Sequence, residues 1–214
     1  MQPELPQRPA PFVLSVVGLK KSGKTTVAAG LIAGLSARGV AVAALKRSHL
    51  PDLTFDSRGT DSSRLLEAGA CFVAVRSRNQ TLTVERHAEA RPGADLLELV
   101  PPSARLVVGE GLFPAAAPAD PAPGAGAARA PAAAARRAVV CLRRFEELEE
   151  TLRVRGVRPE EVLALSGVAA GGAARHPEYP VFDVLDPSSA EALCELVLAI
   201  SGLASPGPRP PNGG

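Results

Sequence analysis

The sequence predicts an α/β fold with three layers, in which helices cover both faces of a mostly parallel sheet. Residues 12–17 are an apolar run rich in β-branched side chains, which is typical of a buried parallel strand. An amphipathic helix follows, because Val27, Leu31 and Leu35 recur at every fourth position. A second apolar run at residues 40–46 predicts another buried strand and completes a β–α–β unit with parallel strands. The chain has 214 residues, 46% of them hydrophobic, which is enough for one such domain with a sizeable core.

The loop between the first strand and the helix, residues 18–26, fits the phosphate-binding pattern G-x-x-x-x-G-K-[ST] at every fixed position. Gly18 and Gly23 have no Cβ, so the backbone can turn tightly and bring its N–H groups close to a triphosphate. Lys24 can reach the β- and γ-phosphates, and Thr25 can coordinate the Mg²⁺ that bridges them. The order of strand, loop and helix therefore predicts a P-loop NTPase. The residues expected to bind the nucleotide are Gly18, Lys21, Ser22, Gly23, Lys24, Thr25 and Thr26.

An acidic residue lies at the end of a later predicted strand. Residues 105–111 are apolar up to Glu110, which is followed by a glycine. Opposite a phosphate loop, an acid at this place is the expected partner of Mg²⁺, although an ordinary strand-terminal glutamate is the alternative. We therefore expect Lys24 and Glu110 as catalytic residues. The expected metal ligands are Thr25, Asp56 and Glu110.

The composition changes after the second predicted strand. Residues 47–60 are polar and aperiodic, and they leave the carboxyl end of a strand, which is where parallel sheets bind ligands. Residues 61–69 predict a short helix, for which Asp61 is more readily an N-cap than a metal ligand. The basic side chains of this stretch are Arg47, His49, Arg58 and Arg64. They are candidates for an anionic second ligand, and a solvated charged loop is the alternative.

Further elements are predicted along the rest of the chain. Strands are expected at residues 70–75, 81–85, 105–111, 138–142, 161–167 and 180–184. Helices are expected at residues 95–100 and 145–153, and a last helix opens with Asp186 as N-cap and Pro187 at its first position. Its expected core side chains are Leu193, Leu196, Val197 and Ile200.

Residues 114–136 are almost entirely Ala, Pro and Gly. Such a segment has too little bulky apolar surface to offset its ordering entropy, so we interpret it as a disordered insertion. The alternative is an additional helical turn at residues 132–137. The predicted boundaries are tails at 1–11 and 204–214, and a single nucleotide-binding domain formed by 12–113 and 137–203.

The composition argues against several classes of protein. A net charge of +2 gives no case for a nucleic-acid-binding protein. Cys71, Cys141 and Cys194 are far apart in the sequence, which argues against a zinc site and a disulfide framework and fits a reducing cytosol. No apolar run approaches the roughly 20 residues that span a bilayer, and the proline-containing N-terminus is no signal peptide. We therefore expect a cytoplasmic protein without a membrane anchor.

Five segments beyond the phosphate loop form a more specific pattern. They are Leu-Lys-Arg-Ser-His at 45–49, Asp-Ser-Arg-Gly-Thr-Asp-Ser at 56–62, Ala-Gly-Ala at 68–70, Val-Gly-Glu-Gly-Leu at 108–112 and Phe-Asp-Val at 182–184. Together they resemble the MobB family, whose members act in molybdopterin guanine dinucleotide biosynthesis. The chain departs from the family where paired histidines are usual, because it has Arg47 and Leu50 there. It also has no [NT]-K-x-D motif for reading guanine.

The resemblance implies a homodimeric P-loop protein that binds GTP with Mg²⁺ and hydrolyses it slowly. Such a protein would assist a guanylyltransferase that joins GMP to molybdopterin, in forming or delivering the guanine dinucleotide. The residues that would bind the pterin are Lys46, Arg47, His49, Asp61, Ser62 and Arg64. The alternative function is an ATP-dependent small-molecule ligase or kinase resembling dethiobiotin synthetase, which would turn over fast with its own substrate.

Overall fold

The computed structural model describes residues 10–46, 65, 68, 70, 72–85, 93–111, 137–172 and 174–203. The chain divides into two compact units, one formed by Met1–Arg47 with Leu96–Gly214 and the other by Ser48–Asp95. Each unit is considered by itself below. The domain boundaries expected from the sequence stay a prediction.

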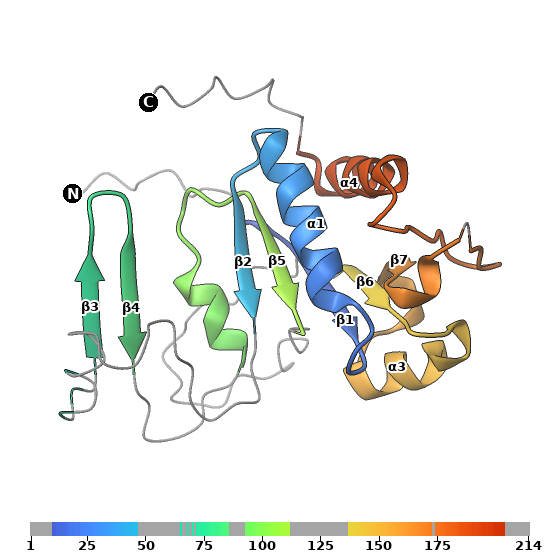
Figure 1. Cartoon of the computed structure of the whole chain (residues 1–214), viewed down its shortest axis with the longest axis horizontal. Helices are drawn as coiled ribbons and strands as arrows, with labels where there is room; N and C mark the ends of the chain where they lie inside the picture. Colours follow the sequence, from blue (N-terminus) through green and yellow to red (C-terminus); the bar gives the residue numbers. More distant parts are fainter. Residues whose placement is uncertain are drawn as a thin grey trace, which may run out of the picture. The chain divides into compact units, whose positions relative to one another are not determined.

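The larger unit contains a five-stranded parallel sheet with the strand order β2-β5-β1-β6-β7 (Figure 1). Its strands are β1 (Phe12–Gly18), β2 (Val42–Lys46), β5 (Leu106–Glu110), β6 (Arg137–Cys141) and β7 (Val162–Ser166). The expected parallel β–α–β unit is therefore confirmed, with β5 lying between its two strands. Because all five strands are parallel, their carboxyl ends lie at one edge of the sheet.

Helices cover both faces of this sheet, as the sequence predicts. On one face, α1 (Lys24–Ala37) and α4 (Pro187–Ser201) pack in a core that includes Leu14 and Val16 of β1. On the other face, α3 (Leu148–Arg155) packs in a core that includes Val17. Neighbouring side chains of one strand point to opposite faces, which is why Val16 and Val17 belong to different cores. Each such fully buried side chain stabilises the fold by about 1.5–3 kcal/mol.

The second strand is less buried than its sequence predicts. In the described part of the chain β2 pairs with β5 only, so it forms an edge of the sheet. Ala44 and Lys46 are exposed, and Leu45 is half-buried. An apolar run occurs in central strands and in edge strands alike. Only the strand order shows that β2 is an edge strand.

The smaller unit contains an antiparallel hairpin of β3 (Phe72–Arg76) and β4 (Thr81–Glu85). The backbone N–H of Ser77 donates to the carbonyl of Gln80 at 2.8 Å and closes the turn between them. Both strands were expected from the sequence. The helix expected at residues 95–100 is a 3₁₀-helix, η1 (Gly93–Leu99).

The strand expected at residues 180–184 is wrong. The segment makes only an isolated parallel bridge between Val181 and Leu165 of β7. Pro180 has no N–H to extend the ladder, and Asp183 begins a turn in which its carboxylate accepts a hydrogen bond from the Leu185 N–H at 2.9 Å. The chain therefore leaves the sheet edge to enter α4.

The start of the last helix is confirmed, whereas part of its predicted core face is wrong. Asp186 is the N-cap, and its carboxylate accepts from the backbone N–H of Ser189 at 2.7 Å. The buried side chains of α4 are Leu193, Cys194, Val197 and Leu198. Leu196 is only half-buried and Ile200 is exposed, because α4 turns Cys194 toward Gly34 of α1. A Cβ at Gly34 would lie 2.6 Å from the Cys194 sulfur, so the missing side chain allows this close packing. Within the described part of the chain, no helix is long and apolar enough to cross a membrane.

Candidate functional site

The P-loop joins β1 to α1 through a coiled backbone. Lys21 and Gly23 have positive φ angles of 63° and 88°, and the Ser22 hydroxyl donates to the Leu19 carbonyl at 2.9 Å. A left-handed lysine is unfavourable by about 1–2 kcal/mol, which the surrounding loop must offset. Gly23 caps α1 without a side-chain hydrogen bond, and the first turn contains no acid. The free N–H groups of this helix end are thus available to an anion.

Residues at the carboxyl ends of two neighbouring strands, β6 and β7, lie against the P-loop backbone. A Cβ at Gly18 would collide with the Cys141 carbonyl at the end of β6, so only glycine fits there. Gly167, directly after β7, has a φ angle of 89°, and a Cβ on it would collide with the Ser22 carbonyl. Gly167 was not among the expected site residues, although a glycine at the end of a predicted strand is the kind of signal that could have found it.

The expected acid lies beside the expected hydroxyl. The strand register sets Glu110 opposite Val16 on one side and Lys46 on the other. The Thr25 hydroxyl donates to Glu110 Oε1 at 2.7 Å. Lys46 Nζ donates to both carboxylate oxygens of Glu110 at 3.0 Å. The structure thus brings together residues that are up to 85 positions apart in the sequence.

This group of oxygen atoms fits Mg²⁺. A hydroxyl and a carboxylate are the hard donors that the ion prefers, and it commonly keeps waters and phosphate oxygens as its other ligands. No group of three or more His, Cys, Asp or Glu side chains gathers in the described residues, so a metal cage made of protein alone is not found there. The ammonium of Lys46 already places a positive charge against Glu110. Thr25 and Glu110 are therefore the described residues that would hold Mg²⁺.

Lys24 lies at the start of α1 with its charge partly buried. Its Nζ donates to the Leu19 carbonyl at 2.5 Å. Its pKa is lowered from the ordinary lysine value, first by burial and second by the positive charge of Arg155. Cys141 and Glu110 act in the opposite direction and do not outweigh these two causes. A cation held in this way is stabilised by any anion that binds next to it.

The two described cysteines are structural. Burial raises the pKa of the Cys141 thiol to about 12, and burial also raises the pKa of Cys194. Both are free, buried thiols. A neutral thiol is a poor nucleophile and a poor metal ligand, so these residues fill space in the core.

Several expected site residues lie outside the described part of the chain. They are Arg47, His49, Asp56, Arg58, Asp61, Ser62 and Arg64. Of the expected pterin ligands only Lys46 is described, and its amine contacts Glu110. Thr26 is exposed in the first turn of α1. The structure therefore assembles the phosphate end of the expected site and leaves the second-ligand end a prediction.

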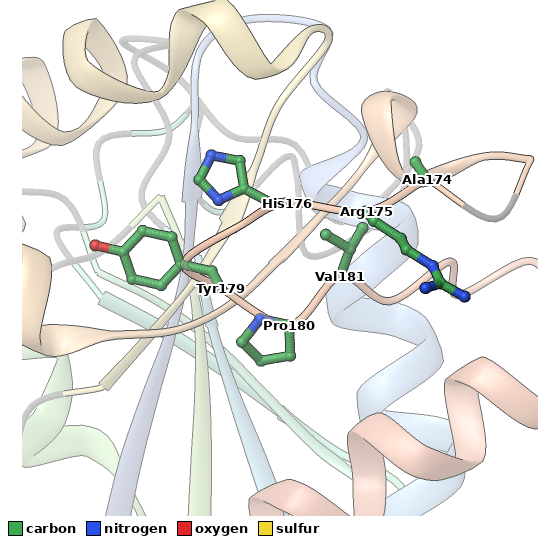
Figure 2. Close-up of a pocket in the computed structure, with 6 residues that line it drawn as sticks. All are labelled: Ala174, Arg175, His176, Tyr179, Pro180 and Val181. Atoms are coloured by element: carbon green, nitrogen blue, oxygen red, sulfur yellow. The ribbon is translucent and has the colours of Figure 1, made fainter.

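A separate shallow pocket of about 370 Å³ lies along the outer side of β7 (Figure 2). It is lined by Ala174, Arg175, His176, Tyr179, Pro180 and Val181. The His176 ring lies 5.7 Å from the ring of Phe145 and 5.6 Å from the ring of Tyr179. None of the expected site residues lines this pocket.

Known proteins share this architecture. The family model for molybdopterin guanine dinucleotide synthesis protein B (MobB) matches residues 13–118, which include the P-loop and Glu110. The crystal structure of Bacillus subtilis MobB superposes with a TM-score of 0.58 at 21% identity, covering 86% of this chain and 96% of that one. A molybdopterin-guanine biosynthesis protein B gives 0.58 at 23% identity, with 89% and 99% covered. The MobB homologue from Bacillus stearothermophilus gives 0.54 at 22% identity, with 89% and 98% covered.

The search of curated proteins gave no match. At identities of 21–23% the solved structures show a common fold, and the family model covers the P-loop and the strand-end acid within that fold. On this evidence the chain belongs to the MobB family, which acts in molybdopterin guanine dinucleotide biosynthesis.

Proposed function

We propose that this protein binds GTP with Mg²⁺ at the P-loop, hydrolyses it slowly, and assists a guanylyltransferase in forming or delivering molybdopterin guanine dinucleotide. The observation that supports the proposal most is the hydrogen bond of 2.7 Å between the Thr25 hydroxyl and Glu110. It joins the phosphate loop to a strand-end carboxylate, as a Mg²⁺–nucleotide site requires. The protein would work as a homodimer in the cytoplasm.

Each residue has a distinct task in this proposal. The loop N–H groups and the Lys24 ammonium would bind the β- and γ-phosphate oxygens. Thr25 and Glu110 would hold Mg²⁺, which supplies charge neutralisation on those oxygens. The Lys46 side chain is 58% exposed, so its ion pair with Glu110 contributes at most about 1 kcal/mol. Lys46 is therefore free to exchange Glu110 for a phosphate oxygen.

Slow hydrolysis is what the family resemblance implies. The Glu110 oxygens accept hydrogen bonds from Thr25 and Lys46, so this carboxylate belongs to the expected metal site. Hydrolysis also needs a group that orients the attacking water, and the acids Asp56 and Asp61 lie outside the described residues.

The second ligand is proposed for the loop after β2. Lys46 is the last residue of that strand, and its amine lies next to Glu110. For the residues after Lys46 the proposal rests on the family resemblance. Arg47, His49, Asp61, Ser62 and Arg64 would bind the pterin phosphate or its nucleotide conjugate. Arg64→Ala should then weaken molybdopterin binding about tenfold, which is roughly 1.4 kcal/mol, and leave GTP affinity within about twofold.

Replacing Lys24 tests the nucleotide proposal. Lys24→Ala should reduce GTP affinity at least about a hundredfold in calorimetric titration, because charge-assisted hydrogen bonds to two phosphates are lost at roughly 1.5–3 kcal/mol each. Lys20→Ala is the matched control, since Lys20 is an exposed lysine of the same loop, and its affinity should stay within about threefold. Unchanged GTP affinity in Lys24→Ala would contradict the proposal.

Steady-state turnover separates the two candidate functions. GTP and ATP hydrolysis should be measured with and without molybdopterin. The proposal expects low turnover that prefers GTP. Fast turnover of ATP with a small substrate would support the ligase or kinase alternative instead.

A further inference from the structure

One face of α3 carries two buried side chains and then an arginine. Leu148 and Thr151 are buried, and Arg155 follows at the seventh position after Leu148. Residues spaced three, four and seven apart lie on the same side of a helix. Leu148 shares a core with Val17 of β1, and α3 contacts β1 directly. Arg155 therefore extends the face of α3 that packs on the strand leading into the P-loop.

Two polar atoms on this face are buried without a partner. Thr151 Oγ1 and Arg155 Nε have no hydrogen bond within the described part of the protein. The two residues are four positions apart, so both atoms belong to the same side of α3. Native proteins leave few buried donors unpaired, because each such donor loses its hydrogen bonds to water. An anion that reaches the Arg155 end of α3 would accept a hydrogen bond from the guanidinium.

The positive charge of Arg155 affects the pKa of Lys24 in the P-loop. After burial, it is the largest cause of the lowered pKa of Lys24, and it exceeds the opposite effect of Glu110. Two cations held near each other repel, and this repulsion lowers the stability of the protein unless an anion lies between or beside them. A polyanion bound beside Lys24 and Arg155 would relieve this repulsion.

We propose that Arg155 binds the nucleotide triphosphate next to Lys24, so that α3 contributes a second positive charge to the phosphate site. The inference rests on the proposed triphosphate binding. A guanidinium is suited to this task because it stays charged when buried and donates two parallel hydrogen bonds to a phosphate. No residue of α3 was expected in the site from the sequence.

The competing explanation is that Arg155 only stabilises the carboxyl end of α3. Arg153 and Arg155 both lie in the last turn of α3, where a positive charge interacts favourably with the carboxyl end of the helix dipole. That role applies equally to both arginines. Arg153 is exposed, whereas Arg155 is half-buried with an unpaired Nε. Arg153 is therefore the matched control.

The test compares Arg155→Met, Arg155→Lys and Arg153→Met in the full chain. Inorganic triphosphate and GTP are titrated by calorimetry at low and moderate salt. Arg155→Met should bind both ligands about tenfold more weakly and with a shallower salt dependence. Arg155→Lys keeps the charge without the planar fork, so it should lose about threefold. Arg153→Met should stay within twofold of the wild type. Without ligand, the melting temperature of Arg155→Met should not fall, because a repulsive charge is removed.

The outcomes distinguish this inference from the proposed function. If the wild type binds inorganic triphosphate and neither Arg155 variant differs from Arg153→Met, the inference is wrong and the proposed function stands. Equal losses of ligand affinity in Arg153→Met and Arg155→Met would mean that both arginines act at the helix end. This outcome would also overturn the inference. If the wild type binds no triphosphate, both proposals fail. Should Arg155→Met not fold, Arg155→Lys decides, since a loss of affinity supports the inference and wild-type affinity overturns it.

Discussion

At the scale of single residues, the site depends on contacts that join two strands and a helix. Thr25 lies in the first turn of α1, Glu110 ends β5 and Lys46 ends β2. The polar atoms of Thr25 and Lys46 nevertheless lie 2.7–3.0 Å from the Glu110 carboxylate. Each residue type is common in proteins and shows no function by itself. Their meeting at the carboxyl edge of the sheet makes a cation site next to a phosphate loop.

Glu110→Gln tests this cation site. An amide is a weaker Mg²⁺ ligand than a carboxylate, so the variant should lose about tenfold or more in GTP affinity with Mg²⁺ and little without it. Calorimetric titrations with Mg²⁺ and with a chelator would measure the two values. Glu149→Gln, at an exposed position of α3, should change neither. Equal losses in both conditions would assign Glu110 a structural role.

At the scale of elements, the turn after β7 supports the P-loop. The Val168 N–H donates to the Ser22 carbonyl at 3.4 Å, and the Ala169 N–H donates to the Leu142 carbonyl at 2.9 Å. Gly167 lies between β7 and this turn with φ 89° and ψ −154°, a conformation that side chains disfavour. The shape of the phosphate loop is therefore set in part by a segment more than 140 residues later in the chain.

Gly167→Ala should lower both stability and nucleotide affinity. Its Cβ would press on the Ser22 carbonyl, and its backbone strain is of order 1–3 kcal/mol. Gly172→Ala is the control, because Gly172 also has a positive φ, 75°, but open space around its Cβ position. The melting temperature should fall in both variants, whereas calorimetry should show weaker GTP binding in Gly167→Ala only. Equal GTP affinities would mean that the turn does not shape the loop.

At the scale of the whole molecule, the strand order gives the Ala/Pro-rich segment a topological task. β5 and β6 flank β1 on opposite sides, and all three strands are parallel. The chain must return from the end of β5 at Glu110 to the start of β6 at Arg137. A connection between parallel strands takes about a dozen residues or more. Composition alone suggests a dispensable insertion, whereas the topology makes part of it necessary.

Two deletions of different length test this requirement. Removing Ala115–Ala135 leaves five linking residues between Glu110 and Arg137, so we expect a fall of more than about ten degrees in melting temperature, or no folding. Removing Asp120–Arg129 leaves a link longer than a dozen residues. This deletion should hardly change the melting temperature, because halving a flexible loop alters its closure entropy by only about 0.6 kcal/mol. Equal stability of both deletions would show that the crossover needs fewer residues than expected.

The sequence by itself determined the features that local chemistry encodes. The P-loop needs glycines, a lysine and a threonine at fixed spacing, so residues 18–26 predicted it directly. Glu110 was found for a similar reason, because a strand followed by an acid and a glycine is a local pattern. The N-cap Asp186 belongs to the same class, since its side chain bonds within its own turn.

The tertiary structure alone decided what depends on partners distant in the sequence. The strand order placed β2 at an edge, and the packing of Cys194 on Gly34 turned α4 so that Ile200 is exposed. Gly167 and Arg155 were missed for the same physical reason. Their surroundings come from the P-loop, which lies more than 120 residues earlier in the chain. A glycine at a strand end and an arginine at a helix end look ordinary in the sequence. In the folded chain the Ser22 carbonyl lies against Gly167, and the charge of Arg155 lowers the pKa of Lys24.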